Sequence, residues 1–306
     1  MAYNQNHSWG RMIAESLKSR PRVGKILVVV GETNVNFEEL NEIFPATDKI
    51  RVVTTLQAAI DLTTASSDDT IFVAPYHTEN ITAAATVALN KAGVSIIGLG
   101  HGTSRPTFTW TTAIAASWDV SAADCWIENF LFDLTGFDAV TAGFNITAAN
   151  CTFKNNEFIV ADGGGQAALA ILTTAAASGL RLEGNKFFGT TNAGTAAAVR
   201  IVGGSKHYIR DNLFIGAYTT SLGAIDNATT EASQIFVGYN VIQNRTASST
   251  KAMVFVSTST GFIVNNHMQI LSGDDPITGA AMSWGGINTF AAAIATTVIA
   301  GRTQQN

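Results

Sequence analysis

The side chains that could do chemistry in this chain are a few acids and arginines at a shared spacing. Asp133 and Asp162 are 29 residues apart, with Asp138 close to the first, and Arg181 and Arg210 are also 29 apart. Two carboxylates at a fixed separation can act as acid and base in sugar hydrolysis, and a cluster of carboxylates can hold Ca²⁺. No Arg or Lys stands in step with these acids, so we interpret all five side chains as solvated surface charges. We predict no catalytic residues and no enzymatic activity.

The histidines and cysteines lack the spacing of a metal site or a nucleophile. The five histidines are scattered over positions 7, 77, 101, 207 and 267, and no His/Cys set has the spacing of metal ligands. No His or Asp recurs in step with Cys125 and Cys151, which argues against a cysteine nucleophile. The sequence therefore predicts no metal and no cofactor.

The composition favours a folded, charge-poor β protein. Apolar residues make up 46% of the 306 residues and charged residues only 13%, against about 25% charged in ordinary globular proteins. This excludes a disordered polyampholyte, a coiled coil and a typical soluble helical enzyme. A net charge of −5 gives no electrostatic case for binding nucleic acid. The N-terminus has no basic and apolar leader, and Pro276, several glycines and Asn288 interrupt the charge-free stretch 276–301, so we expect neither export nor a membrane span.

One pattern repeats along the chain: an apolar residue, any residue, an apolar residue, two positions, then Asn, any residue and an apolar residue. Its asparagines are spaced by 29, 27, 28 and 26 residues, at Asn156, Asn185, Asn212, Asn240 and Asn266. A related unit one residue shorter, Cys125–Phe132, has its Asn at position 129. Units of this length wind as a coil in which each strand pairs in parallel with its equivalent one turn later.

The repeat predicts which side chains stack. We expect about seven coils, the five asparagines at one bend, where Asn tolerates left-handed backbone, and their amides hydrogen-bonded along the stack. N-glycosylation or ligand binding is the alternative role for Asn residues in this chain. The apolar partners should form one buried column: Phe158, Phe187, Phe214, Ile242 and Met268.

Two further sets of residues have alternatives that the sequence leaves open. Cys125 and Cys151 occupy equivalent places 26 residues apart, so they should stack in adjacent coils, more plausibly as inward thiols than as a disulfide. Trp110, Trp118 and Trp126 are 8 residues apart. They could form a sugar-binding ladder, but we favour core packing.

From about Thr70 to Met268 these repeats resemble the right-handed parallel β-helix of the pectate-lyase-like superfamily. The approach to the repeats is similar too: a helix of the form Leu-Gln-Ala-Ala-Ile-Asp at 56–61, a strand at 69–75 and an extended run at 77–81. The resemblance implies an all-β fold, a right-handed single-stranded parallel β-helix with a small α/β N-terminal cap and an N-terminal arm. Enzymes on this fold usually cleave acidic polysaccharides with clustered acids and an Arg or Lys base.

Four segments follow from these observations: an N-terminal arm at 1–24, an α/β capping unit at 25–66, the parallel β-helix at 67–270 and a C-terminal segment at 271–306. In the capping unit we predict strands at 25–30 and 50–53 and a helix capped by Asn36. A second helix should begin at the capping-box pattern of Thr54 and Gln57. The Asn pattern stops after Met268, and 290–299 should be a helix or a closing strand.

The arm has a composition that suits attachment to a partner. The first 25 residues carry five basic side chains and one acidic one, about +4, which leaves −5 − 4 = −9 for the rest of the chain. We predict that the arm contacts another subunit through Trp9, Arg11, Met12, Ile13, Leu17, Lys18, Arg20 and Arg22.

The chain also resembles β-helical proteins encoded among the virion genes of tailed bacteriophages, most closely over 69–107. This resemblance implies a non-enzymatic structural protein of a virion, assembled in the host cytoplasm and associated with the capsid as a decoration, vertex or fibre-like protein. Its partners would be other virion proteins, the capsid protein first, and further copies of itself, with a trimer as one arrangement; we expect no nucleic-acid or membrane partner. The alternatives are a tailspike-like carbohydrate-binding or polysaccharide-degrading protein and a bacterial surface adhesin.

Overall fold

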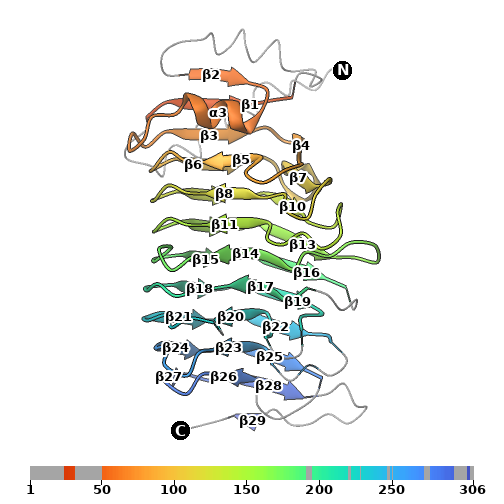
Figure 1. The fold of residues 1–306 in the computed structure, drawn as a ribbon, viewed down its shortest axis with the longest axis vertical. Helices are drawn as coiled ribbons and strands as arrows, with labels where there is room; N and C mark the ends of the chain where they lie inside the picture. Colours follow the sequence, from red (N-terminus) through yellow and green to blue (C-terminus); the bar gives the residue numbers. More distant parts are fainter. Residues whose placement is uncertain are drawn as a thin grey trace.

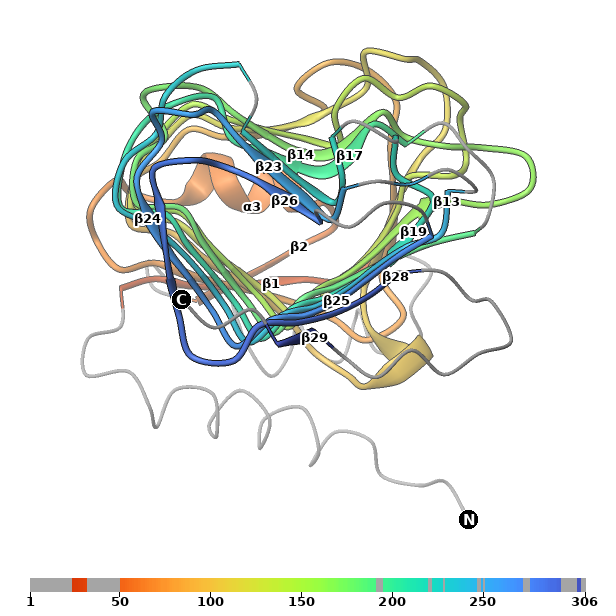
Figure 2. The same ribbon diagram turned by 90° about the horizontal axis from the view of Figure 1, so that it is seen from below.

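The chain forms a parallel β-solenoid, as the repeat predicts. The structure, a computed structural model, describes residues 24–31, 50–190, 195–219, 222–227, 229–246, 249, 251–271, 276–292 and 302–303. Its strands form three long sheets, one on each side of the coil (Figures 1 and 2). The predicted arm, apart from Gly24, and the helix predicted after Asn36 lie outside the described residues.

Sheet A has eleven strands. In spatial order they are β2 (Ile50–Val53), β1 (Ile26–Val29), β3 (Thr70–Val73), β6 (Ser95–Gly98), β9 (Trp126–Glu128), β12 (Thr152–Lys154), β15 (Arg181–Glu183), β18 (Tyr208–Arg210), β21 (Ile235–Gly238), β24 (Gly261–Val264) and β27 (Met282–Gly285).

Sheet B has ten strands and sheet C has eight. Sheet B contains β4 (Thr78–Ile81), β7 (Thr107–Trp110), β10 (Leu131–Asp133), β13 (Glu157–Ala161), β16 (Lys186–Gly189), β19 (Leu213–Gly216), β22 (Val241–Asn244), β25 (His267–Ile270), β28 (Thr289–Ala292) and β29 (Arg302–Thr303). Sheet C contains β5 (Val87–Leu89), β8 (Trp118–Val120), β11 (Phe144–Ile146), β14 (Leu169–Thr173), β17 (Ala197–Arg200), β20 (Ile225–Asn227), β23 (Met253–Phe255) and β26 (Ile277–Thr278). Among the strand pairs of the described residues, only β28 and β29 pair antiparallel.

The solenoid extends beyond the boundary predicted at residue 270. Eight coils, from β3 to β26, each contribute one strand to every sheet, one more than the expected number of about seven. The strands β27 and β28 begin another coil. The predicted end was too early because the last Asn follows its predecessor by only 22 residues, a shorter step than the earlier ones.

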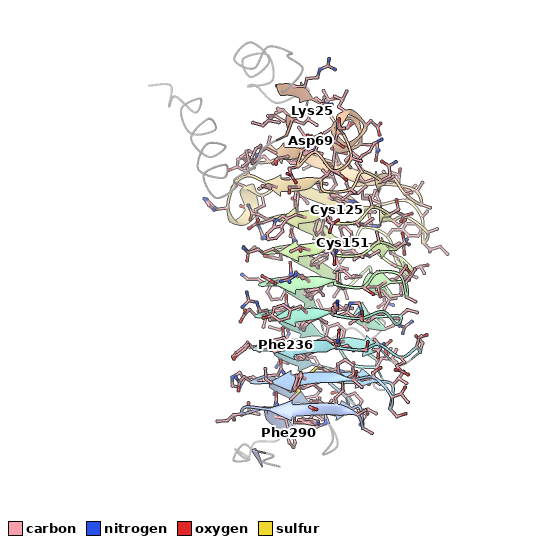
Figure 3. All side chains as sticks on the ribbon, turned by 90° about the vertical axis from the view of Figure 1, so that its left-hand side faces the viewer. Lys25, Asp69, Cys125, Cys151, Phe236 and Phe290 are labelled. Atoms are coloured by element: carbon pink, nitrogen blue, oxygen red, sulfur yellow. The ribbon has the colours of Figure 1, made fainter. Side chains whose placement is uncertain are left out.

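The N-terminal strands belong to the same sheet as the coils. The predicted strands at 25–30 and 50–53 are confirmed as β1 and β2, and β1 pairs in parallel with β3. The buried Asp69 carboxylate accepts hydrogen bonds from the backbone N–H groups of Lys25 and Thr64, each at 2.6 Å. Figure 3 labels Lys25 and Asp69. This carboxylate ties the start of β1 to the loop before β3.

The second predicted helix is α3 (Leu56–Leu62), and it begins one residue later than expected. Its N-cap is Thr55, whose hydroxyl accepts a hydrogen bond from Ala58 N–H at 3.3 Å. The predicted capping box of Thr54 and Gln57 is therefore wrong. The Gln57 side chain instead accepts from the N–H of Ala88 on β5, at 2.7 Å, so a tertiary bond to a sheet replaced the local one. Within the described residues α3 is the only α-helix, and none is long and apolar enough to cross a membrane.

The interior of the coil is a continuous apolar core. Strand register places the five predicted partners in one column through sheet B, and all are buried: Phe158, Phe187, Phe214, Ile242 and Met268. The rings of Phe158 and Phe187 stack with centroids 4.5 Å apart, and Phe187 and Phe214 stack at 4.8 Å. The predicted column is confirmed, and Phe132 and Phe290 extend it. The right-handed sense of the coil and the capping role of its N-terminal unit stay predictions.

We expect Phe187→Ala to lower the free energy of unfolding by about 3–5 kcal/mol, because the cavity would remove ring contacts to both neighbouring coils. Urea unfolding followed by circular dichroism measures this loss. Phe188→Ala is the matched control, since Phe188 is the next residue on β16 and only half-buried. Equal losses from the two variants would contradict the buried column.

Candidate functional site

The five predicted asparagines lie one above another at the bend between sheets A and B and form a hydrogen-bonded ladder. From Asn185 onward, the Oδ1 of each residue accepts from the backbone N–H and from the Nδ2 of the asparagine one coil earlier, at 2.8–3.2 Å. Each Nδ2 also donates to a backbone carbonyl of the sheet A strand one coil earlier, as Asn185 does to Phe153 on β12 at 2.8 Å. All five side chains are buried. The ladder therefore satisfies polar backbone at a bend that lies against the apolar core.

The ladder is longer than the sequence pattern predicts, because it includes Asn288. The Asn288 Oδ1 accepts from Asn266 N–H and Nδ2 at 3.0 and 3.1 Å. At the other end, the Asn156 Oδ1 accepts from Phe130 N–H at 3.0 Å. The related unit at Asn129 therefore places Phe130, not Asn129, at the ladder position. Aligning inward residues rather than spacing would have revealed Asn288, since Phe290 follows it in the place of Met268.

The left-handed backbone at this bend belongs to the residue before each ladder asparagine. Asn155, Asp211, Tyr239 and Asn265 all have φ between 52° and 59°, and Gly184 has φ 67°. The prediction that the ladder asparagines themselves take this conformation is wrong. The ladder needs asparagine at these positions because its side-chain amide has both a donor and an acceptor for hydrogen bonds to neighbouring coils.

The two cysteines are buried, free and stacked in adjacent coils (Figure 3). The thiol stack is confirmed and the disulfide alternative is not. Burial raises the pKa of Cys125 to about 11 and that of Cys151 to about 12. Both groups are therefore thiols rather than thiolates at neutral pH, and a thiol is a poor nucleophile and a poor metal ligand.

The acids and arginines considered as catalytic candidates have structural partners. The Asp133 Oδ1 accepts from the N–H and hydroxyl of Thr135. Hydrogen bonds from the N–H groups of Gly164 and Gly165 lower the pKa of Asp162. A carboxyl group with a lowered pKa is unsuited to act as a general acid. Asp138 is a surface residue in the loop after β10.

The two arginines share one carboxylate on the outer face of sheet A. Arg181 and Arg210 both pair with Glu183, at 3.6 and 3.4 Å. Glu183 raises the pKa of Arg210, which keeps the guanidinium protonated and unsuited to act as a base. Among the residues that the structure describes, no three His, Cys, Asp or Glu side chains gather as a metal site.

The outer face of sheet A also carries aromatic side chains, and two of them, Tyr208 and Phe236, stack on each other. The rings of Tyr208 and Phe236 stack at 4.7 Å, and the Arg181 guanidinium lies 5.6 Å from the Tyr208 ring centroid. Figure 3 shows Phe236 at the outer edge of the coil. Stacked rings present their edges to solvent, whereas a sugar-binding platform needs an open ring face. This row therefore stabilises the sheet rather than offering a platform.

The tryptophans divide between core and surface. Trp110 and Trp118 are fully buried, which confirms core packing for these two. Trp126 lies on the outer face of β9, where its Nε1 donates to Glu128 and the Lys154 ammonium lies 5.4 Å from its ring. Core packing is wrong for Trp126, because the alternation along β9 places Ile127 inward instead.

A groove of about 560 Å³ lies on sheet B near its C-terminal end. Its polar lining comes from Gln243, Gln269, His267 and Thr289, and Ile215 and Val241 are among its apolar lining residues. The His267 ring hydrogen-bonds to Thr289, and Gln243 donates to Gln269, so the polar groups are paired along the coil axis. No Lys, Arg, Asp or Glu lines this groove. It can receive a neutral ligand that has both hydroxyl groups and apolar faces.

The eight predicted partner-binding residues of the arm lie outside the described residues, so the structure brings none of them to a site. Comparison of the chain with protein-family models, with curated proteins and with solved structures finds no match.

We expect Asn212→Ala to lower the free energy of unfolding by on the order of 3 kcal/mol, because it removes buried hydrogen bonds to three neighbouring residues. The N–H of Asn185 loses its acceptor, the carbonyl of Leu182 loses a donor, and the Nδ2 of Asn185 and the Oδ1 of Asn240 each lose one of two partners. Thermal and urea unfolding measure the loss. Asn145→Ala is the control, since Asn145 is half-buried and its Nδ2 donates a hydrogen bond to the Asp119 carboxylate. A loss for Asn212→Ala no larger than that of the control would refute the stabilising role of the ladder.

Proposed function

We propose that the chain is a non-enzymatic structural protein of a phage virion, associated with the capsid and anchored by its N-terminal arm. The observation that carries the proposal is the ladder and core column, which run together through the coils. Every coil is tied to the next by side-chain hydrogen bonds as well as by three sheets. Such a body is rigid, which suits a particle component that projects from a shell.

The state of the reactive groups supports a structural role. The cysteines are protonated, Arg210 is held as a cation and Asp162 as an anion, so these four side chains are unsuited to act as nucleophile, base and acid respectively. The resemblance over 69–107 to phage virion proteins and the basic, apolar arm support the location and the anchor.

The proposal predicts that the chain is present at a fixed copy number in density-gradient-purified virions of the phage that encodes it. A chain lacking residues 1–23 should fold but no longer join particles, since Gly24 keeps its hydrogen bond to Asp68. Quantitative mass spectrometry of the particles measures occupancy. A full-length chain in which Arg11, Lys18, Arg20 and Arg22 are replaced by Gln is the matched variant, and it should also lose occupancy. Absence of the chain from virions would refute the virion role, whereas full occupancy without residues 1–23 would move the anchor to 271–306.

The second candidate function is carbohydrate binding, and the groove on sheet B is the observation that favours it. Amide, imidazole and hydroxyl groups can exchange hydrogen bonds with sugar hydroxyls, and Ile215 and Val241 can contact the apolar face of a sugar ring. This function would make the chain a tailspike-like binding protein.

If the groove binds a sugar, a neutral host-surface oligosaccharide should bind the chain, and Gln243→Ala should weaken the binding at least tenfold. Isothermal titration calorimetry measures the affinity. Gln166→Ala, in a loop outside the groove, should leave it unchanged. Equal affinities of the two variants would place the sugar elsewhere, and absence of binding would remove this candidate.

A further inference from the structure

One inward column of the core contains an imidazole. The column lies where sheet C turns into sheet A, and its members directly precede the sheet A strands. Strand register places the buried His207 between Leu180 and Ile235 of the neighbouring coils. From the second coil onward the column runs Val94, Cys125, Cys151, Leu180, His207 and Ile235. His207 therefore occupies a place that aliphatic or thiol side chains occupy in the other coils.

The His207 ring has one hydrogen-bond partner. Its Nε2 lies 3.0 Å from the carbonyl oxygen of Gly203. A carbonyl oxygen can only accept, so Nε2 carries the hydrogen of the neutral ring. Nδ1 is buried and has no partner among the described residues. Protonation would add a second N–H without an acceptor and place a positive charge between Leu180 and Ile235, which is costly in an apolar interior.

The bend at 203–207 is shaped around this ring by two glycines. Gly203 and Gly204 have φ of 72° and 80°, in the left-handed region. Within the described ranges no other two consecutive glycines have this conformation. A Cβ at Gly204 would lie 3.1 Å from His207 Nε2 and 3.2 Å from the carbonyl oxygen of Ala175. Glycine thus leaves the room in which the ring reaches the carbonyl oxygen of Gly203.

In the part of the chain that the structure describes, no charged group stabilises an imidazolium at this place. The charged residues of the adjoining bends are exposed, and those of the adjoining strands lie on the outer faces of sheets A and C: Lys206, Glu231, Arg181, Glu183, Arg210, Arg200 and Asp226. Tyr208 is also on the outer face, stacked on Phe236. Tyr218 is inside the core, and burial raises its pKa, so it stays uncharged.

The other buried histidine has a different environment. His77 Nε2 lies 2.6 Å from the carboxylate of Glu79, an acidic partner for a protonated ring. His207 has only a backbone carbonyl. Of the two buried imidazoles, His207 is therefore the one whose protonation the closed structure opposes.

We propose that His207 is a pH-sensitive switch in the bend at 203–207, which the neutral imidazole holds closed and the imidazolium opens. Burial lowers the pKa of His207 in the closed bend, whereas a hydrated imidazole titrates near about pH 6.5. The closed bend is therefore fully favoured above about pH 6.5. Below that value each pH unit favours the open bend by up to about tenfold, until the pH reaches the lowered pKa. The switch goes beyond the virion role and does not depend on it.

Opening would break the bonds that tie this bend to the bends of the neighbouring coils. Lys206 N–H donates to the carbonyl of Ser233, Ser233 N–H to that of Gly204, and Gly179 N–H to that of Ser205. The N–H of Ser205 donates to the Ser178 hydroxyl at 3.1 Å. The amides of these four donors should therefore exchange with solvent together when the bend opens.

Hydrogen exchange of the full chain, measured by mass spectrometry and corrected for the intrinsic pH dependence of amide exchange, tests the switch. Peptides that contain 176–180, 203–208 and 231–235 should lose protection by about tenfold or more between about pH 7.5 and about pH 5. Peptides from β9 and β12 should keep theirs. Unchanged protection of the bend, or an equal loss in β9 and β12, would overturn the proposal.

Non-titrating variants assign the effect to the imidazole. His207→Leu should keep the bend closed at both pH values, because Leu180 fills the same place one coil earlier. His207→Gln is a second neutral variant whose amide can donate to Gly203, and it decides the test if leucine opens the bend at neutral pH. The matched control is His101→Gln at an exposed histidine, which should retain the wild-type loss. A pH-dependent loss of protection that persists in both His207 variants would also overturn the proposal.

Discussion

In-register parallel stacking is the constraint on which the rest of this structure depends. Each inward side chain lies directly above its equivalent one coil earlier, at the spacing of neighbouring strands, about 4.8 Å. Like charges stacked at that distance repel one another in a low-dielectric interior, whereas phenyl rings and carboxamides attract. Two kinds of side chain satisfy this constraint. The apolar kind forms the column through Phe158, Phe187 and Phe214, and the polar kind forms the asparagine ladder.

The same constraint determines what happens to groups that could be reactive. Stacked cysteines face each other in an apolar environment, which raises both thiol pKa values. On the outer face, Glu183 pairs with Arg181 on its own strand β15 and with Arg210 from the next coil, so that the charges neutralise one another. Groups that stand alone in the sequence thus acquire partners from the coils above and below. These groups stabilise the stacked coils, which is why we propose a structural role.

Stacking has a further consequence at the ends, because a solenoid has no intrinsic stop. The apolar residues Leu56, Ala59 and Ile60 of α3 are buried in the core. At the C-terminal end the columns finish in Trp284, Asn288 and the half-buried Phe290.

The sequence by itself determined the coil, the ladder from Asn156 to Asn266 and the Phe column, because each repeats locally at a spacing that only stacked strands explain. It favoured inward thiols at Cys125 and Cys151 and left a disulfide open, and the structure decided for the free thiols. The tertiary structure alone decided that Asn288 continues the ladder, since a shorter last coil alters the spacing, and that Phe130 begins it. It alone decided that Gln57 bonds to Ala88 rather than capping its own helix, and that Trp126 faces outward. Register between coils and contacts between distant strands are set by packing, which local patterns do not encode.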